Sequence, residues 1–133
     1  MALYKNSLRE NSENADAMLA LGAASVRTGN YHDAESNLLN AEKYFLKSAL
    51  LQNNLSVLYL KIKDYDNAIA HMNKLLELQP RDVEVQYNIA MANFAKGNRH
   101  ETLELLKSIL ATHPEHRNSM IAVELITNNK LNM

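Results

Sequence analysis

The sequence of 133 residues has no cysteine and no tryptophan, only three glycines and two prolines, and a net charge of −1. Because cysteine is absent, a disulfide framework, a thiolate metal site and a cysteine nucleophile are excluded. The scarcity of glycine and proline favours helices joined by short turns. The 14 basic and 15 acidic residues nearly balance, so charge provides no case for binding nucleic acid or an anionic membrane.

Long hydrophobic runs are also missing. No stretch approaches the roughly 20 apolar residues that a membrane-spanning helix needs, so membrane insertion is not expected. The opening MALYKNSLRENSENADA lacks the cationic start and apolar run of a signal peptide. The missing signal-peptide pattern and the absence of cysteine together favour a cytoplasmic location. A fragment of a longer or exported protein is the alternative.

What the sequence does contain is an internal repeat with a period of 34 residues. Aligning three segments without a gap brings residues of like size into the same columns, and Pro80 and Pro114 close the second and third segments. Because chance rarely aligns so many columns, the period indicates a repeat architecture. The aligned columns are Leu21, Leu55 and Ile89; Gly22, Ser56 and Ala90; Ala34, Ala68 and Thr102; and Leu38, Met72 and Leu106.

These columns resemble the tetratricopeptide repeat (TPR) family over residues 15–116. The second repeat is nearest the family pattern, whereas no tryptophan opens any repeat, Arg99 replaces a tyrosine, and the first repeat ends in Leu46 instead of proline. The resemblance implies pairs of antiparallel helices stacked into a right-handed superhelix, with the first helix of each pair lining a concave groove. The predicted fold class is therefore all-α, an α-α superhelix of three full repeats.

The sequence predicts a single TPR domain over residues 1–133. Small residues such as Gly22, Ser56 and Ala90 are expected where paired helices approach closely, and Asn14 and Asp82 are predicted N-caps. Glu124 in the small-residue column marks a last helix that lacks a partner, as a solenoid cap does. The predicted parts are a partial repeat helix (1–14), repeats over 15–48, 49–82 and 83–116, and a capping helix with tail (117–133). The predicted helices are 2–12, 15–28, 31–46, 49–62, 65–78, 83–96, 99–112 and 117–128, of which the one ending near Leu46 is expected to run longer than its counterparts.

The residues predicted to line the groove form a mostly apolar stripe with asparagines between. Tyr87, Met91 and Phe94 share one helix face, a shape suited to anchoring apolar side chains of a partner. The alternative is that some of these residues pack against a neighbouring repeat. The predicted binding residues are Leu19, Ala23, Asn53, Asn54, Val57, Glu84, Tyr87, Asn88, Met91, Phe94 and Ile121.

Chaperone-binding members of the family grip the C-terminus of a peptide with lysine, arginine and asparagine side chains. Of those columns only Asn54 matches, and the others hold Leu19, Ala23, Glu84 and Asn88. Because a terminal carboxylate finds no cation here, binding of chaperone tails that end in Glu-Glu-Val-Asp is not expected.

The sequence shows no signal for an enzyme. It has no glycine-rich phosphate loop, no nucleophile motif and no cluster of paired carboxylates. His113 and His116 flank a turn with the sequence HPEH, but a third metal ligand is not evident, so both are predicted to be surface turn residues. No catalytic, cofactor-binding or metal-binding residue is therefore predicted.

Two functions remain open from the sequence. The first is a non-enzymatic module that binds a protein or peptide segment with apolar anchors in the groove. The alternative is an assembly factor or chaperone-like component of a larger complex, such as a bacterial pilus or secretion system. In that case self-association through an exposed apolar face, for example around Tyr4 and Leu8, would contribute.

Overall fold

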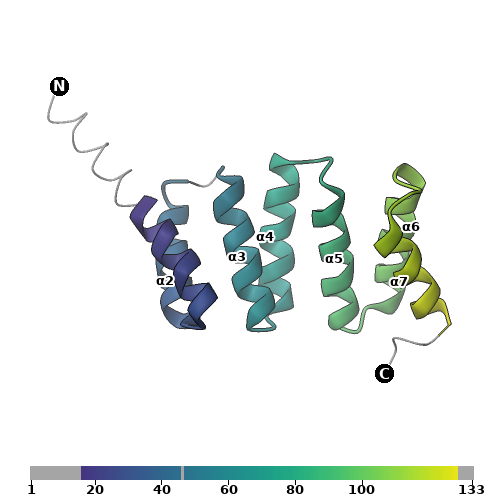
Figure 1. The fold of residues 1–133 in the computed structure, drawn as a ribbon, viewed down its shortest axis with the longest axis horizontal. Helices are drawn as coiled ribbons and strands as arrows, with labels where there is room; N and C mark the ends of the chain where they lie inside the picture. The colour runs from purple at the N-terminus through teal and green to yellow at the C-terminus, as the bar shows by residue number, and fades with distance from the viewer. Residues whose placement is uncertain (1–15, 46, 129–133) are drawn as a thin grey trace, which may run out of the picture. The chain divides into compact units, whose positions relative to one another are not determined.

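The computed structural model describes residues 16–45 and 47–128, and within these ranges every regular element is a helix (Figure 1). The chain divides into two compact units, Met1–Leu78 (unit 1) and Gln79–Met133 (unit 2). In the described part, unit 1 comprises a helix over residues 16–28, α2 (Tyr31–Glu42), α3 (Ala49–Lys61) and α4 (Tyr65–Leu78). Unit 2 comprises α5 (Val83–Ala95), α6 (Arg99–Thr112) and α7 (Arg117–Thr127).

The core of unit 1 forms where small residues let the helices approach closely. A Cβ atom added at Gly22 would lie 2.5 Å from both Cγ and Cδ2 of Leu38, so only glycine fits opposite that side chain. Leu38, Leu55 and Ala68 are fully buried, whereas Leu21, in the same repeat column as Leu55, is 57% exposed. On α4 the buried residues follow one helical face, Ala68, His71, Met72 and Leu75, so this face packs inward.

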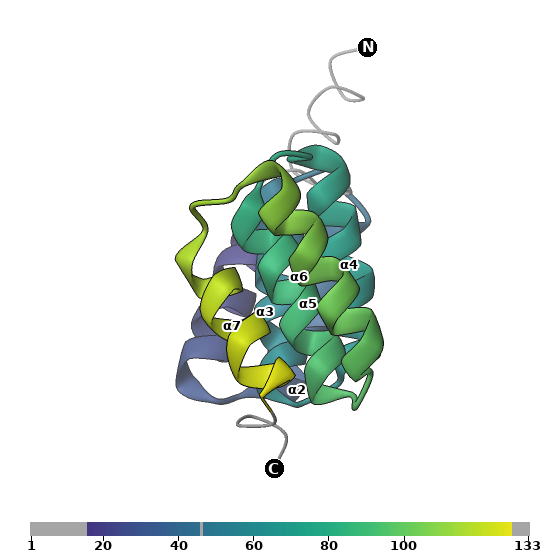
Figure 2. The same cartoon turned by 90° about the vertical axis from the view of Figure 1, so that its right-hand side faces the viewer.

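The core of unit 2 is a cluster of Ala90, Leu106, Ile109, Ala122 and Ile126, contributed by all three helices. The Thr102 hydroxyl on α6 donates to the Ala90 carbonyl on α5, so these helices touch at the predicted small-residue column. The Arg99 guanidinium donates to the Ile126 carbonyl in the last turn of α7, where a cation is favoured by the helix dipole. Figure 2 shows α5, α6 and α7 together, with α7 lying against α6.

Turns between paired helices repeat with the period of the sequence. Gly29 and Gly97 adopt positive φ values of 85° and 91°, and Lys63, at the equivalent place in the second repeat, adopts 62°. Glycine takes this conformation without steric cost, whereas lysine does so with some strain. Asp82 caps α5 as predicted, since its side chain accepts from the amides of Glu84 and Val85. The turns and the Asp82 cap therefore follow the sequence.

The prediction of a longer second helix in the first repeat is wrong. That helix, α2, ends at Glu42 and is the shortest of the three second helices, with 12 residues against 14 in α4 and α6. The amides of Tyr44 and Phe45 both bond to the Ala41 carbonyl, and Ser48 caps α3 by accepting from the Leu51 amide. These turn and cap bonds end the helix without glycine or proline.

Some predictions lie outside the described residues, namely the helix over 2–12 with Tyr4 and Leu8, the Asn14 cap, and the end of the first repeat at Leu46. In the described part of the chain, no helix is long and apolar enough to cross a membrane.

Candidate functional site

In unit 2, the predicted binding residues of α5 lie on one side of the helix and differ in exposure. We call Glu84, Tyr87, Asn88, Met91 and Phe94 the α5 stripe. Its three apolar members are half-buried and pack against the unit 2 core cluster, while Asn88 is exposed. These apolar residues therefore contribute to the packing of unit 2, and each keeps part of its surface in solvent. On α7, Ile121 is 46% exposed.

Unit 1 contributes fewer accessible apolar residues than predicted. Leu19 is only 9% exposed and belongs to the core. The prediction that Leu19 is a binding residue is therefore wrong. Ala23, Asn54 and Val57 are half-buried and Asn53 is exposed. In unit 1 the accessible part of the predicted stripe is thus mainly asparagine, which offers hydrogen bonds to a partner's backbone rather than an apolar anchor.

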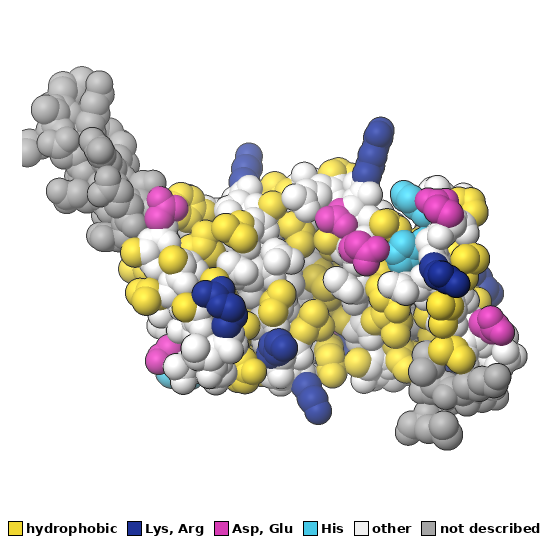
Figure 3. Space-filling model, viewed as in Figure 1, with side chains coloured by type: hydrophobic (Ala, Val, Ile, Leu, Met, Phe, Trp, Pro, Cys, Tyr) yellow, Lys and Arg dark blue, Asp and Glu magenta, His cyan; other side chains and the backbone are white. Residues whose placement is uncertain are grey.

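Figure 3 shows hydrophobic side chains gathered over α5 and α7 on the face in view. Tyr87, Met91 and Phe94 on α5 are partly exposed to solvent. On α7, Ile121 is exposed, and Met120 is 45% exposed. Partly exposed apolar residues on adjacent helices are common at protein-binding surfaces.

His116 is not the exposed turn residue that the sequence predicted. Its side chain is 11% exposed and caps α7, since Nδ1 accepts from the Ser119 amide at 3.2 Å. Nε2 lies 2.8 Å from Oε1 of Glu84, and the imidazole packs at 5.5 Å from the Tyr87 ring. We call Glu84, Tyr87, His116 and Ser119 the His116 cluster. The cap requires a lone pair on Nδ1, so the proton lies on Nε2 and is donated to Glu84.

The His116 cluster joins α5 to the start of α7 within unit 2. Burial, and then the Glu84 carboxylate, raise the pKa of Tyr87 above its ordinary value, so its phenol stays neutral at physiological pH. The contact with His116 Nε2 holds the Glu84 carboxylate, which is 62% exposed, beside the apolar members of the α5 stripe.

Replacement of His116 is expected to separate its two roles. His116→Ala removes both the cap and the Glu84 contact, and should lower the free energy of unfolding by about 1 kcal/mol or somewhat more. His116→Asn keeps a capping oxygen and loses only the Glu84 contact, so its loss should be smaller. Urea unfolding of the two variants measures the difference, and equal losses would contradict the capping role.

A buried polar network lies at the junction of α2, α3 and α4 in unit 1. Gln52, fully buried on α3, donates through Nε2 to Oε2 of Glu42 at 2.9 Å, and its Oε1 lies 2.8 Å from Nδ1 of His71. Nζ of Lys74 lies 3.3 Å from the same Glu42 oxygen. We call Glu42, Gln52, His71 and Lys74 the His71 network.

The Glu42 carboxylate sets the direction of hydrogen bonding in the His71 network. Because the carboxylate only accepts, the Gln52 amide must present its NH₂ group to Glu42 and its oxygen to His71, so His71 carries its proton on Nδ1. Burial raises the pKa of Glu42, but the hydrogen bond from Gln52 and the nearby charges of Lys74 and His71 outweigh it and lower the pKa overall. Burial lowers the pKa of His71, so this imidazole is neutral at pH 7.

The Tyr59 ring and a further carboxylate extend the His71 network. The Tyr59 ring stacks on the His71 imidazole with centroids 5.4 Å apart and an interplanar angle of 11°. The Tyr59 hydroxyl donates to Oε2 of Glu35 at 2.9 Å. Burial and this hydrogen bond raise the pKa of Tyr59, so the phenol remains protonated.

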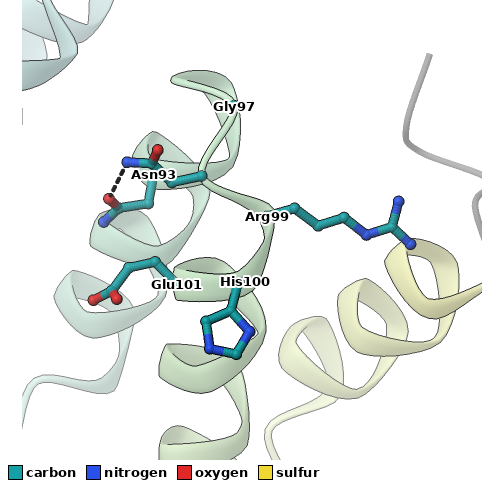
Figure 4. A pocket seen from close by; sticks show the side chains of 6 residues that line it. Asn93, Gly97, Arg99, His100 and Glu101 are labelled. Carbon is teal, nitrogen blue, oxygen red and sulfur yellow. Dashed lines mark hydrogen bonds between the residues drawn. The ribbon is translucent and has the colours of Figure 1, made fainter.

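An open pocket of about 620 Å³ lies at the turn between α5 and α6 (Figure 4). None of the predicted binding residues lines it. Asn98 donates to Asn93 at 3.3 Å, and the Arg99 side chain extends away from the pocket toward the end of α7. The side chains of Asn93, Asn98 and Arg99 thus bond to one another or elsewhere. The lining residues are Asn93, Gly97, Asn98, Arg99, His100 and Glu101.

Among residues 16–45 and 47–128, no group of three or more histidine, aspartate or glutamate side chains could hold a metal ion.

A human relative, tetratricopeptide repeat protein 12, is 26% identical over 107 residues, which cover 80% of this chain. The chain spans only 15% of the length of that protein.

Three solved structures are similar in fold. MamA matches with a TM-score of 0.76 at 19% identity, covering 96% of this chain and 74% of its own. The TPR domain of Arabidopsis OM64 matches with a TM-score of 0.73 at 16% identity, covering 90% of this chain and 98% of its own. The first TPR domain of Spaghetti, bound to the HSP90 peptide SRMEEVD, matches with a TM-score of 0.72 at 17% identity, covering 89% and 94%.

The tetratricopeptide repeat model matches residues 23–83 and 55–117, two overlapping segments that together span more than half of the chain. Together with the helix pairs, the turns with positive φ and the small residues at the helix crossings, these matches show that the chain belongs to the tetratricopeptide repeat family.

Proposed function

We propose that this chain is a non-enzymatic interaction module that binds a protein segment through the α5 stripe and Ile121 in unit 2. The observation that carries the proposal is the partly exposed apolar surface of α5 and α7, formed by Tyr87, Met91, Phe94 and Ile121. The solved relative bound to a peptide supports binding of a segment, because it has the same fold. We also propose that the three predicted repeats act as one domain, 1–133.

The chemistry of the surface restricts the partner. Aromatic and methionine side chains accept apolar anchors, and methionine adapts its shape to them. Asn88 is exposed beside these anchors and offers both a donor and an acceptor to a partner's backbone. The proposed ligand is therefore a segment with two or three apolar side chains.

The same surface disfavours a peptide C-terminus of the chaperone type. The Glu84 carboxylate is part of the α5 stripe and would repel the carboxylates of a peptide such as SRMEEVD. We therefore propose that this chain does not share the peptide of the Spaghetti domain.

The test uses peptides selected with the wild-type chain from a random displayed library, followed by measurement of the dissociation constant Kd. Ile121→Ala should raise Kd by roughly tenfold to thirtyfold, because it removes an anchor contact of about 1.4–2 kcal/mol. Ile121 is preferable to Tyr87 and Phe94 for this test, because those two residues also support the unit 2 core.

Met120 provides the matched control, since it is adjacent, equally exposed and outside the predicted stripe. Met120→Ala should leave Kd within about twofold of wild type. Equal losses in the two variants, or selected peptides without apolar anchors, would refute the proposed surface. Binding of SRMEEVD at similar affinity would refute the exclusion of chaperone tails.

A further inference from the structure

The His71 network places a neutral, nearly buried imidazole at the point where α4 meets α2 and α3. The His71 side chain is 9% exposed, and its Nδ1–H is bound to Gln52, which is itself bound to Glu42. A second link from α4 to α2 is the ion pair of Lys74 with Glu42. Both of these polar links from α4 to α2 therefore end at the same atom, Oε2 of Glu42.

Protonation at Nε2 would turn the imidazole into a cation, with the charge shared by both ring nitrogens, while Nδ1–H stays bound to Gln52. The charged and titratable groups facing it are Glu42 from α2, Tyr59 from α3, and Lys74 from its own helix, and the Tyr59 hydroxyl is occupied by Glu35.

The Glu42 carboxylate, Lys74 and burial decide whether the folded state tolerates the charge on His71. The Glu42 oxygen nearest to Nδ1, at 3.6 Å, already accepts from Gln52 and Lys74. Burial removes the water that would otherwise solvate the new charge, and this cost outweighs the attraction of the Glu42 carboxylate, while Lys74 adds repulsion. The charged imidazole is therefore poorly compensated in the folded state.

We propose that His71 is an acid-sensitive latch, whose protonation releases α4 from α2 and α3 and opens unit 1. This device does not depend on what the α5 stripe binds, since every group in it belongs to unit 1.

The direction of the pH effect follows from linkage. Burial lowers the pKa of His71 below its ordinary value of 6.5, so the open state binds a proton more readily than the closed one. The closed state is therefore fully favoured above about pH 6.5 and loses stability as the pH falls below that value, until the lowered pKa is reached. Glu42 adds to the loss only at lower pH, since its pKa lies below 4.5.

The experiment is amide hydrogen exchange of the full chain between pH 7.5 and 5.5, corrected for the intrinsic exchange rate. In the wild-type chain, the opening equilibrium reported by α4 amides should rise by up to about tenfold per pH unit below about 6.5. In His71→Asn it should stay within about twofold across this range. Asparagine places an NH₂ group near the position of Nδ1 and does not titrate.

His32→Asn is the matched control, because His32 is an exposed histidine on α2 in the same unit. It should retain the full pH dependence of the wild-type chain. The same pH dependence in His71→Asn as in the wild-type chain would overturn the proposal.

A second measurement keeps the test decisive if His71→Asn does not fold. The ¹⁵N shifts of the wild-type His71 ring should show the Nδ1–H form at pH 7.5 and should titrate together with the loss of α4 protection. Titration at 6.5 or above with unchanged protection would refute the latch, as would loss of protection while His71 stays neutral.

Discussion

Leu106→Ala is expected to lower the free energy of unfolding by about 2–5 kcal/mol. Leu106 is fully buried at the centre of the unit 2 core cluster, in contact with residues from α5, α6 and α7. Truncation removes its burial energy and leaves a cavity that three helices cannot readily collapse. Urea unfolding monitored by circular dichroism measures the loss, and exchange of the α5–α7 amides should show that it falls on unit 2.

Leu106→Met is the control suggested by the repeat itself. Met72 occupies the same column in the second repeat and is also buried, so methionine fits this position of a helix pair. A volume-conserving exchange should cost less than about 1.5 kcal/mol. If Leu106→Ala lost no more than Leu106→Met, the column would not be a core column and the repeat register would be wrong.

Gln52→Ala is expected to lower the free energy of unfolding by about 2–4 kcal/mol, unusually much for a polar residue. Gln52 is fully buried and is bonded to Glu42 on one side and His71 on the other. Its removal leaves a cavity and deprives both partners of a hydrogen bond in a place that water reaches poorly. Urea unfolding at pH 7.5, where His71 is neutral, measures this loss separately from the latch.

Gln86 is the control, because it lies in the same column, 34 residues later, and is only half-buried. Its Nε2 makes one bond, of 3.3 Å, to the Pro80 carbonyl. Gln86→Ala should therefore cost no more than about 0.5–1 kcal/mol. Similar losses at both positions would show that the network around Gln52 contributes little to stability.

The candidate site was predictable in part. Helical spacing placed Tyr87, Met91 and Phe94 on one face of α5, and the structure has them there. The spacing could not decide how far each side chain is covered, because burial depends on which helices pack over that face. Leu19 illustrates the limit, since its register matches Tyr87 and Ile121 whereas its side chain is buried.

The His116 cluster and the His71 network were not predicted, and their sequence signals differ. His71 lies three residues after Ala68 and four before Leu75, on the buried face of α4, so its spacing marked it as buried. Its partners could not be read from spacing, because Gln52 and Glu42 come from two other helices. His116 had no comparable signal, since histidine is an uncommon cap and Glu84 lies 32 residues away.

The sequence by itself determined the helix pairs, the close crossings at Gly22 and Ala90, and the turns at Gly29 and Gly97. These features depend on local geometry and on a period that repeats along the chain, so residue order suffices to predict them. Only the tertiary structure decided where α2 ends, which apolar residues stay exposed, and which polar groups meet inside unit 1. Those outcomes depend on distances between residues remote in sequence, and hydrogen bonds and burial change sharply over a few ångströms.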